Sequence, residues 1–212
     1  MRNSNAYTAI DKLSIPPFTN HSSFSHEEKI QLIEEHFAEI MQVLGLDLTD
    51  DSLKDTPKRV AKMYVNEIFS GLNPLQKPQV SLFENKYAYH NMLLEKNITV
   101  FSHCEHHFVP FTGKAHVAYI PDKYVIGLSK INRIVQYYAR RPQVQERLTM
   151  EIAKEMQQLM RTDHVAVVIE ANHLCVAARG IEDTSSSTVT SFFGGRFQEE
   201  ILQNEFLQAI KS

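Results

Sequence analysis

The sequence is poor in cysteine, and no apolar run approaches the ~18 residues needed to cross a bilayer. No basic and apolar leader follows Met1. Only two cysteines occur among the 212 residues, while 43% of the residues are apolar, so the chain can build a core without disulfide staples. We therefore expect a soluble, cytoplasmic protein with no membrane partner.

Positive charge is not in excess. The formal net charge is −3, which gives the chain no general attraction to nucleic acid or to anionic membranes. We expect no nucleic-acid partner, and any anionic ligand must be bound by a local basic cluster. The sequence also lacks internal repeats, and its length suits one domain of good size with an appended segment.

The N-terminal part divides into an arm and a helical region. Residues 1–25 are rich in Ser, Asn and Thr, a composition that buries little apolar surface, and we expect a flexible arm. Residues 26–95 form the predicted helical region. Its first helix is indicated by apolar residues at helical spacing from Ile30, with Ser25 and Glu28 placed as a capping box.

A second helix is predicted from the triplet Asp55-Thr56-Pro57. Thr56 would cap this helix, and Pro57 would occupy its first helical position. Apolar residues at helical spacing continue to Gly71, which marks the expected end. The first third of the chain is thus predicted to be a helical layer.

Residues 96–212 are predicted to form an α+β domain with the order strand, strand, helix, helix, strand, strand. Runs of β-branched and aromatic residues over 98–101 and 115–120 predict the first hairpin. Helical spacing then predicts two helices on either side of Arg141-Pro142, and the run 165–169 predicts a third strand. A Ser/Thr-rich stretch over 184–191 follows later, and then a terminal helix with Ile201, Leu202 and Phe206 on one side.

Both cysteines lie in segments that also contain histidine, namely Cys104-Glu105-His106-His107 and His173-Leu174-Cys175. Thiolate sulfur and imidazole nitrogen are ligands that Zn²⁺ prefers, and Cys-x-x-His spacing lets one turn supply two of them. Three protein ligands would leave a position for water, as in a catalytic site. Alternatively, His106 or His173 closes the site, the thiols form a disulfide, or they are inert core residues. A reducing cytoplasm weakens the disulfide alternative.

The last strand of the domain is predicted from the alternation between His173 and Arg179, as the second arm of a hairpin after Ala171-Asn172. On such a strand, the side chains of His173, Cys175 and Arg179 would share one face. That face would combine an acid/base group, a metal ligand and a fixed cation. A solvated polar face is the alternative, but an exposed free thiol without a role is unusual.

A basic cluster lies at the expected start of a helix. Ser129 is placed as an N-cap, with Lys130 and Arg133 in the first turn, and such a helix start can bind phosphate oxygens. Ordinary capping with surface cations is the alternative reading. Glu146 is similarly ambiguous, because an acidic residue near a helix start is favourable for the helix dipole alone.

Taken together, four segments of the chain resemble the GTP cyclohydrolase I family. They occur in the family's order and spacing, and the resemblance runs from about residue 27 to the C-terminus. The segments are Cys104-Glu105-His106-His107, residues 125–133, residues 141–147, and His173-Leu174-Cys175 with Arg179-Gly180.

The resemblance implies a zinc hydrolase that opens the imidazole ring of GTP, releases C8 as formate and forms 7,8-dihydroneopterin triphosphate. This reaction is the first step of tetrahydrofolate and pterin biosynthesis. By similarity, Zn²⁺ would be held by Cys104, His107 and Cys175. His106 and His173 match the catalytic histidines of the family, and Ser129 resembles a residue that relays a proton during the later rearrangement.

The resemblance also implies how the substrate is held. Glu146 would accept hydrogen bonds from the guanine N1 and N2 donors, and Gln145 is counted among the substrate-binding residues. The triphosphate would contact three basic residues of the chain and a fourth from a neighbouring subunit. The three are Lys130, Arg133 and Arg179, and the fourth is Arg59.

Family members adopt the tunnelling fold and assemble as toroidal decamers with sites at subunit interfaces, so a homodecamer is implied here. The sequence itself indicates only that two hairpins would leave exposed strand edges in a monomer. Two other hypotheses stay open. One is a nucleotide- or pterin-binding module that has lost catalysis, and the other is an interaction scaffold with a closed, four-ligand zinc site.

Overall fold

A computed structural model describes residues 24–211, so the predicted arm lies outside the described residues except for its last two positions. The chain divides into two compact units, Met1–Val65 and Asn66–Ser212. Each unit is described by itself. Within the described residues, no helix is both long and apolar enough to cross a membrane.

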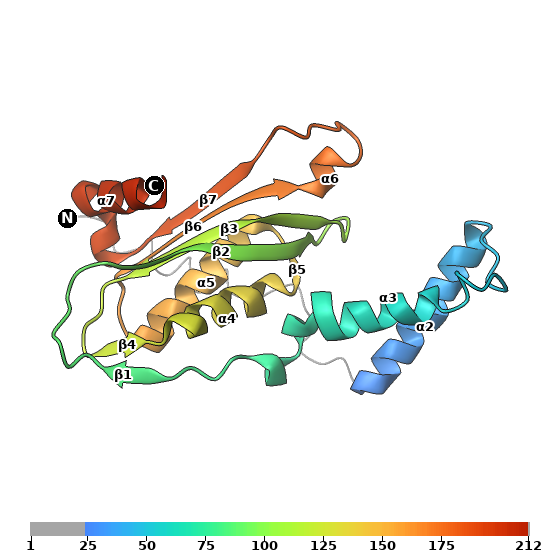
Figure 1. The fold of residues 1–212 in the computed structure, drawn as a ribbon, viewed down its shortest axis with the longest axis horizontal. Coiled ribbons are helices and arrows are strands. Elements are labelled where there is room, and N and C mark those ends of the chain that lie inside the picture. Colours follow the sequence, from blue (N-terminus) through green and yellow to red (C-terminus); the bar gives the residue numbers. More distant parts are fainter. Residues whose placement is uncertain (1–23, 212) are drawn as a thin grey trace, which may run out of the picture. The chain divides into compact units, whose positions relative to one another are not determined.

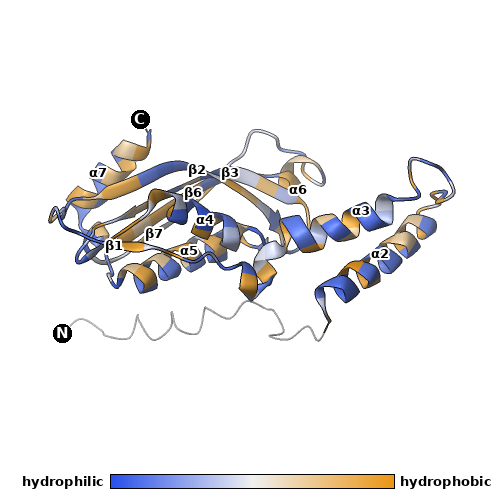
Figure 2. Cartoon of the chain, turned by 60° about the horizontal axis from the view of Figure 1, so that its bottom comes forward, coloured by the Kyte–Doolittle hydropathy of each residue, from blue (hydrophilic) through white to orange (hydrophobic). Residues whose placement is uncertain are grey.

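The first unit contains two helices, α2 (His26–Val43) and α3 (Thr56–Met63). The predicted capping box of α2 is confirmed, because Ser25 Oγ accepts from Glu28 N at 3.2 Å and the Glu28 carboxylate accepts from Ser25 N at 2.6 Å. The chain leaves the helix at Gly45, whose φ of 79° suits glycine. Apolar and polar residues alternate along both helices, as Figure 2 shows.

The predicted cap of α3 is wrong by one residue. The N-cap is Asp55, and its carbonyl already accepts the first helical hydrogen bond, from Arg59 N at 3.0 Å. Thr56 is therefore helical, and Pro57 follows it. The helix also ends earlier than predicted, because a π-helical turn, η1 (Tyr64–Ile68), replaces the α-helical pattern before Gly71.

The second unit is built on a five-stranded sheet with the order β5-β2-β3-β6-β7. All neighbours are antiparallel except β2 and β5, which are parallel. A separate pair, β1 and β4, is antiparallel. The strands are β1 (Leu82–Glu84), β2 (Leu93–Cys104), β3 (Pro110–Tyr119), β4 (Tyr124–Ile126), β5 (Pro142–Gln143), β6 (Val165–His173) and β7 (Thr188–Phe193).

Helices cover the two faces of this sheet unequally. The predicted helix pair, α4 (Leu128–Ala139) and α5 (Gln145–Met160), packs on one face and encloses the larger core (Figure 1). The terminal helix, α7 (Glu200–Lys211), covers part of the other face through Phe206. Along β6, the odd-numbered residues from Val165 to Ala171 belong to the α4/α5 core, which is the period-two pattern of a strand.

The predicted strand from His173 to Arg179 is wrong. Strand β6 continues through Ala171-Asn172 to His173, and the chain then forms a short helix, α6 (Leu174–Ala177). Besides β3, the partner of β6 is β7, which begins inside the Ser/Thr-rich stretch and ends at Phe193. It pairs with β6 over Ala166–Ala171.

Two smaller expectations are corrected. Ser129 is not the cap of α4, because Gly127 holds the N-cap position and the helix begins at Leu128. In α7, Phe206 is buried as predicted, whereas Ile201 is 84% exposed and lies outside the apolar side.

Candidate metal centre and active site

The turn after β2 positions the first two candidate ligands. Cys104 N donates to Val109 O at 2.9 Å, and Phe108 N donates to Cys104 O at 2.8 Å, which closes a tight turn. Phe108 has a φ of 52°, so the backbone reverses there in the left-handed region. Cys104 and His107 are thereby delivered from one turn.

The sheet topology brings the third candidate to the same place. Strands β2 and β6 both run antiparallel to β3, so their C-terminal ends lie at the same end of the sheet. Cys104 ends β2, and Cys175 lies in α6 directly after β6. Residues separated by 71 positions therefore meet.

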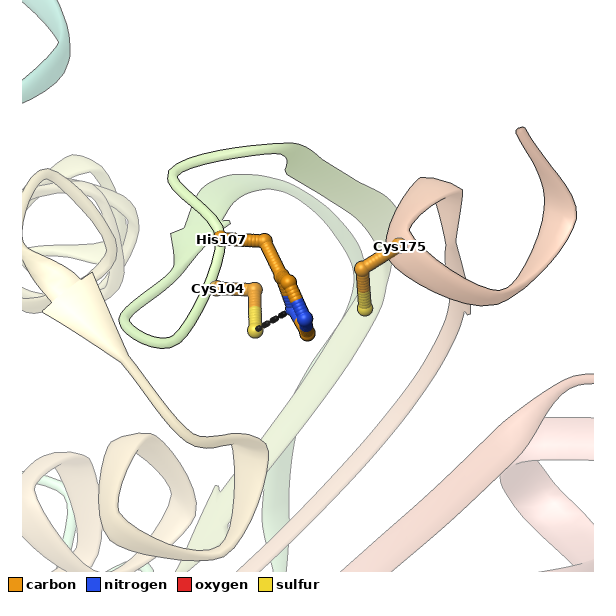
Figure 3. A group of neighbouring side chains, drawn as sticks. All are labelled: Cys104, His107 and Cys175. Carbon is orange, nitrogen blue, oxygen red and sulfur yellow. Dashed lines mark hydrogen bonds between the residues drawn. The ribbon is translucent and has the colours of Figure 1, made fainter. Parts of the chain in front are cut away.

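The three side chains point toward one another, as Figure 3 shows. One ligand atom from each of Cys104, His107 and Cys175 lies within 4.8 Å of the others, and Cys104 Sγ lies 3.7 Å from His107 Nδ1. Tetrahedral ligands at bond lengths of about 2.0–2.3 Å are roughly 3.5 Å apart, so the group fits a metal ion with small adjustments.

The alternatives for the two thiols can now be compared with the structure. Both cysteines are free, so no disulfide forms. His106 and His173 are not members of the metal-binding group found among residues 24–211. Burial, followed by the neighbouring Cys104 thiol, raises the pKa of Cys175. The uncharged form of the Cys175 thiol is therefore favoured until a metal ion displaces its proton.

His173 lies beside this group at the end of β6. Its ring stacks on Phe111, its register partner on β3, with ring centres 4.6 Å apart and an interplanar angle of 15°. Its Nε2 lies 2.8 Å from Gln145 Oε1 on α5. Burial lowers the pKa of His173, and the Glu146 carboxylate partly opposes this shift.

Gln145, predicted to contact the substrate, is only 2% exposed. Its amide nitrogen donates to Ile169 O at 3.0 Å and to Thr188 O at 2.9 Å, and it lies 3.1 Å from Thr190 Oγ1. Its amide therefore links β6, β7 and the imidazole of His173. Glu146, the next residue, is exposed in the first turn of α5.

A partly buried polar network that the sequence did not reveal supports the turn from Cys104 to His107, the candidate metal-binding turn. Arg147 donates to the Glu105 carboxylate, to Gln143 Oε1 at 2.9 Å and to Pro142 O at 3.1 Å. Gln143 is 1% exposed and donates in turn to Glu151 at 2.7 Å. The four-residue separation of Gln143 and Arg147 could have indicated their contact, but nothing in the spacing indicated Glu105.

His106 and Arg179 extend the site toward solvent. The ring of His106 is 64% exposed, and its Nδ1 lies 3.7 Å from Cys104 Sγ. Arg179 Nη1 donates to His107 Nε2 at 2.9 Å. Arg179 is therefore adjacent to the candidate metal-binding group. It does not lie on a strand, because the predicted strand from His173 to Arg179 is not formed.

The basic cluster at the start of α4 lies far from this group within one chain. Asn132 of α4 donates to Glu95 near the beginning of β2, whereas Cys104 ends that strand. Nine residues of extended strand span about 30 Å. The chain therefore does not bring Ser129, Lys130 and Arg133 to its own Cys104. Arg59 belongs to the first unit, where it lies 3.7 Å from the Asp55 carboxylate.

These features define an α+β protein with a Cys-His-Cys group suited to a metal ion, flanked by a half-buried histidine. The family model for GTP cyclohydrolase I matches residues 33–211. The GTP cyclohydrolase 1 of Flavobacterium johnsoniae is 61% identical over 185 residues, which cover 87% of this chain and 83% of the relative.

More distant relatives of the same name cover the chain equally well. That of Salmonella gallinarum is 54% identical over 88% of this chain and 84% of its own length. That of Tolumonas auensis is 51% identical over 94% of this chain and 93% of its own length. The chain belongs to the GTP cyclohydrolase I family and is an enzyme.

Proposed function

We propose that the chain catalyses the zinc-dependent conversion of GTP to 7,8-dihydroneopterin triphosphate and formate, the first step of tetrahydrofolate and pterin biosynthesis. The observation that carries the proposal is the convergence of Cys104, His107 and Cys175 beside His173 in a member of this family. Cys104, His107 and Cys175 would hold Zn²⁺, because two thiols and one imidazole are a donor set that this ion prefers.

The residues around the metal ligands would then carry the proton transfers. Bound Zn²⁺ supplies an acidified water, but two thiolates bring the ion near zero net charge and acidify that water less than neutral ligands would. Neighbouring acid/base groups are therefore needed. His106 and His173 are suited to this role, because imidazole exchanges protons near neutral pH.

Glu146 is the residue proposed to recognise guanine through its N1 and N2 hydrogen-bond donors. Its carboxylate is exposed at the start of α5, and it is close enough to His173 to oppose the fall in that histidine's pKa that burial causes. A carboxylate can accept two parallel hydrogen bonds, which matches the N1 and N2 donors of guanine. Adenine presents an acceptor at N1, so the same carboxylate would disfavour it.

The triphosphate would be bound by Arg179 together with residues of other subunits. Within one chain, Ser129, Lys130 and Arg133 lie about 30 Å along β2 from Cys104. A neighbouring copy can supply them, and Arg59 from another copy. This composite site requires a homo-oligomer, and the exposed edge strand β7 offers a surface for pairing sheets into the barrel of the tunnelling fold. A decamer is the assembly that we propose.

Incubation of the purified, zinc-loaded protein with GTP tests the proposal. We expect release of formate and, after oxidation, a fluorescent pterin, with ATP as the control substrate that yields neither. A protein that binds GTP without releasing formate would instead be a nucleotide-binding module. A protein that holds zinc with four ligands and does not bind GTP would be a structural scaffold.

A further inference from the structure

The side-chain amide of Gln145 has only one orientation that satisfies its surroundings. Its nitrogen faces Ile169 O at 3.0 Å and Thr188 O at 2.9 Å. Both are backbone carbonyls, which only accept hydrogen bonds, so a flipped amide would place its oxygen against two acceptors. The nitrogen of Gln145 therefore faces β6 and β7, and its oxygen faces His173.

This orientation decides which ring nitrogen of His173 carries the proton. Gln145 Oε1 can only accept, and it lies 2.8 Å from His173 Nε2, so Nε2 must donate. In a neutral imidazole the other nitrogen, Nδ1, then holds a lone pair. His173 Nδ1 has no hydrogen-bond partner among residues 24–211, so that lone pair is available.

The surroundings of Gln145 and His173 resist rotation of the His173 imidazole. Phe111 stacks on one face of the imidazole at 4.6 Å. Gln145 is the first residue of α5, is 2% exposed, and its carbonyl accepts from Thr149 Oγ1 at 2.9 Å. Rotation of His173 about its ring axis would break the bond to Gln145 and leave a buried acceptor unpaired.

We infer that Gln145 is a positioning residue that holds His173 in the tautomer protonated at Nε2, so that Nδ1 is the atom that exchanges protons with the substrate. This inference rests on the proposed function of the site, in which His173 transfers protons. It assigns the Gln145 side chain to His173 in place of a direct contact with GTP. In many sites, a residue that accepts a hydrogen bond from one ring nitrogen of a functional histidine fixes the tautomer of that histidine.

The tautomer can be measured directly in the wild-type, zinc-loaded enzyme. Nitrogen-15 chemical shifts of labelled histidine distinguish the two neutral forms at about pH 8, where an unperturbed imidazole is uncharged. The His173 signals are those that disappear in His173→Gln. We expect Nε2 to carry the proton, and a proton on Nδ1 would overturn the inference. Because the measurement needs no turnover, it stands even if the protein does not convert GTP.

Substitution of Gln145 separates positioning from substrate binding. Gln145→Met keeps the length of the side chain and removes the acceptor. We expect unchanged zinc content, a KM for GTP within about threefold of wild type, a kcat lower by roughly 10- to 100-fold, and signals from both tautomers of His173. Gln145→Glu keeps the acceptor toward His173 but also places an oxygen against Ile169 O and Thr188 O. It should therefore be less stable than wild type, yet retain the Nε2-protonated form and recover part of kcat.

Gln157→Met is the matched control, because it is the same substitution on the same helix. The Gln157 amide donates to Asp163 O at 3.1 Å, just before β6 begins, whereas His173 lies at the end of that strand. This variant should keep the kcat and the His173 tautomer of wild type. Equal losses of kcat in Gln157→Met and Gln145→Met, or a raised KM with unchanged kcat in Gln145→Met, would contradict the inference. Should Gln145→Met not fold, the wild-type tautomer decides the question.

Discussion

The guanidinium of Arg179 donates to His107 Nε2 at 2.9 Å. Because arginine only donates, the ring proton of neutral His107 must lie on Nδ1, which faces Cys104 Sγ at 3.7 Å. Ligation of the proposed Zn²⁺ through Nδ1 would remove that proton, and a neutral imidazole would then carry its proton on Nε2. Two donors would then face each other, so Arg179 would have to turn away. In the proposed function, formation of the metal site and release of this cation for the triphosphate would therefore be coupled.

The first prediction concerns Arg179→Ala. The variant should bind zinc at least as tightly as wild type, since no contact to His107 has to be broken. Its KM for GTP should rise about tenfold or more, because a charge-assisted hydrogen bond to phosphate is lost. Zinc competition with a chelator and steady-state kinetics measure the two effects, and Arg179→Lys should recover part of the KM. A loss of zinc from Arg179→Ala would contradict this account.

The adjacent histidines His106 and His107 form a matched pair for the second prediction. His107→Ala and Cys175→Ser should lose the metal, because each removes one of three converging ligand atoms. His106→Ala should keep one zinc per chain yet abolish turnover, since its exposed ring is a proposed proton carrier. Metal analysis of the purified variants, together with formate release, gives both results. Loss of zinc from His106→Ala would show that the ligands are wrongly assigned.

The local parts of this site could be predicted from the sequence, because spacing within one turn or helix is decided by nearby residues. The Cys104-x-x-His107 turn and the helix pair around Arg141-Pro142 are examples. The segment from His173 to Arg179 could not be assigned correctly, since alternation over seven residues also fits a strand end followed by a helical turn. The strand that pairs with β6 in its place is β7, and this pairing joins residues that are far apart along the chain.

Polar contacts between residues far apart along the chain could not be predicted from the sequence either. The bond between Arg147 and Glu105 joins residues that are 42 positions apart, and no local pattern marks it. The role of Gln145 is a related case. Its place in a motif suggested a substrate contact, but only the fold shows that its amide is enclosed by Ile169, Thr188 and Thr190.

The third prediction tests the contact between Arg147 and Glu105 with the variant Arg147→Met. Arg147 and Glu105 side chains are only 15% and 23% exposed, so removal of the guanidinium leaves a carboxylate poorly hydrated beside the metal-binding turn. We expect the free energy of unfolding to fall by about 1–3 kcal/mol and the zinc affinity to fall roughly tenfold or more. Urea unfolding and chelator competition provide the measurements.

A double-substitution cycle is the control for this pair. Glu105→Gln removes the charge that Arg147→Met leaves unpaired, so the double variant should be more stable than the sum of the single effects predicts. Additive losses in the cycle would show that the contact between the two side chains contributes nothing to stability.

The fourth prediction concerns pH and His116, which lies on β3 away from the metal-binding turn and is 7% exposed. Burial lowers its pKa, the Glu170 carboxylate opposes this shift, and Lys96 and Lys114 add to it. The unfolded chain, with an ordinary histidine pKa near 6.5, therefore binds more protons than the folded protein as the pH falls. The contribution of His116 to stability is thus complete above that value and is lost progressively down to the folded-state pKa.

Urea midpoints at about pH 7.5 and about pH 5.5, at one protein concentration, should show this loss in the wild type. His116→Gln cannot take up the proton, so its midpoint should fall less over the same interval. Some decrease should remain in the variant, because burial also lowers the pKa values of His103 and His173. Equal decreases in wild type and His116→Gln would mean that His116 becomes charged as easily in the folded protein as in the unfolded chain, and that its burial carries no penalty.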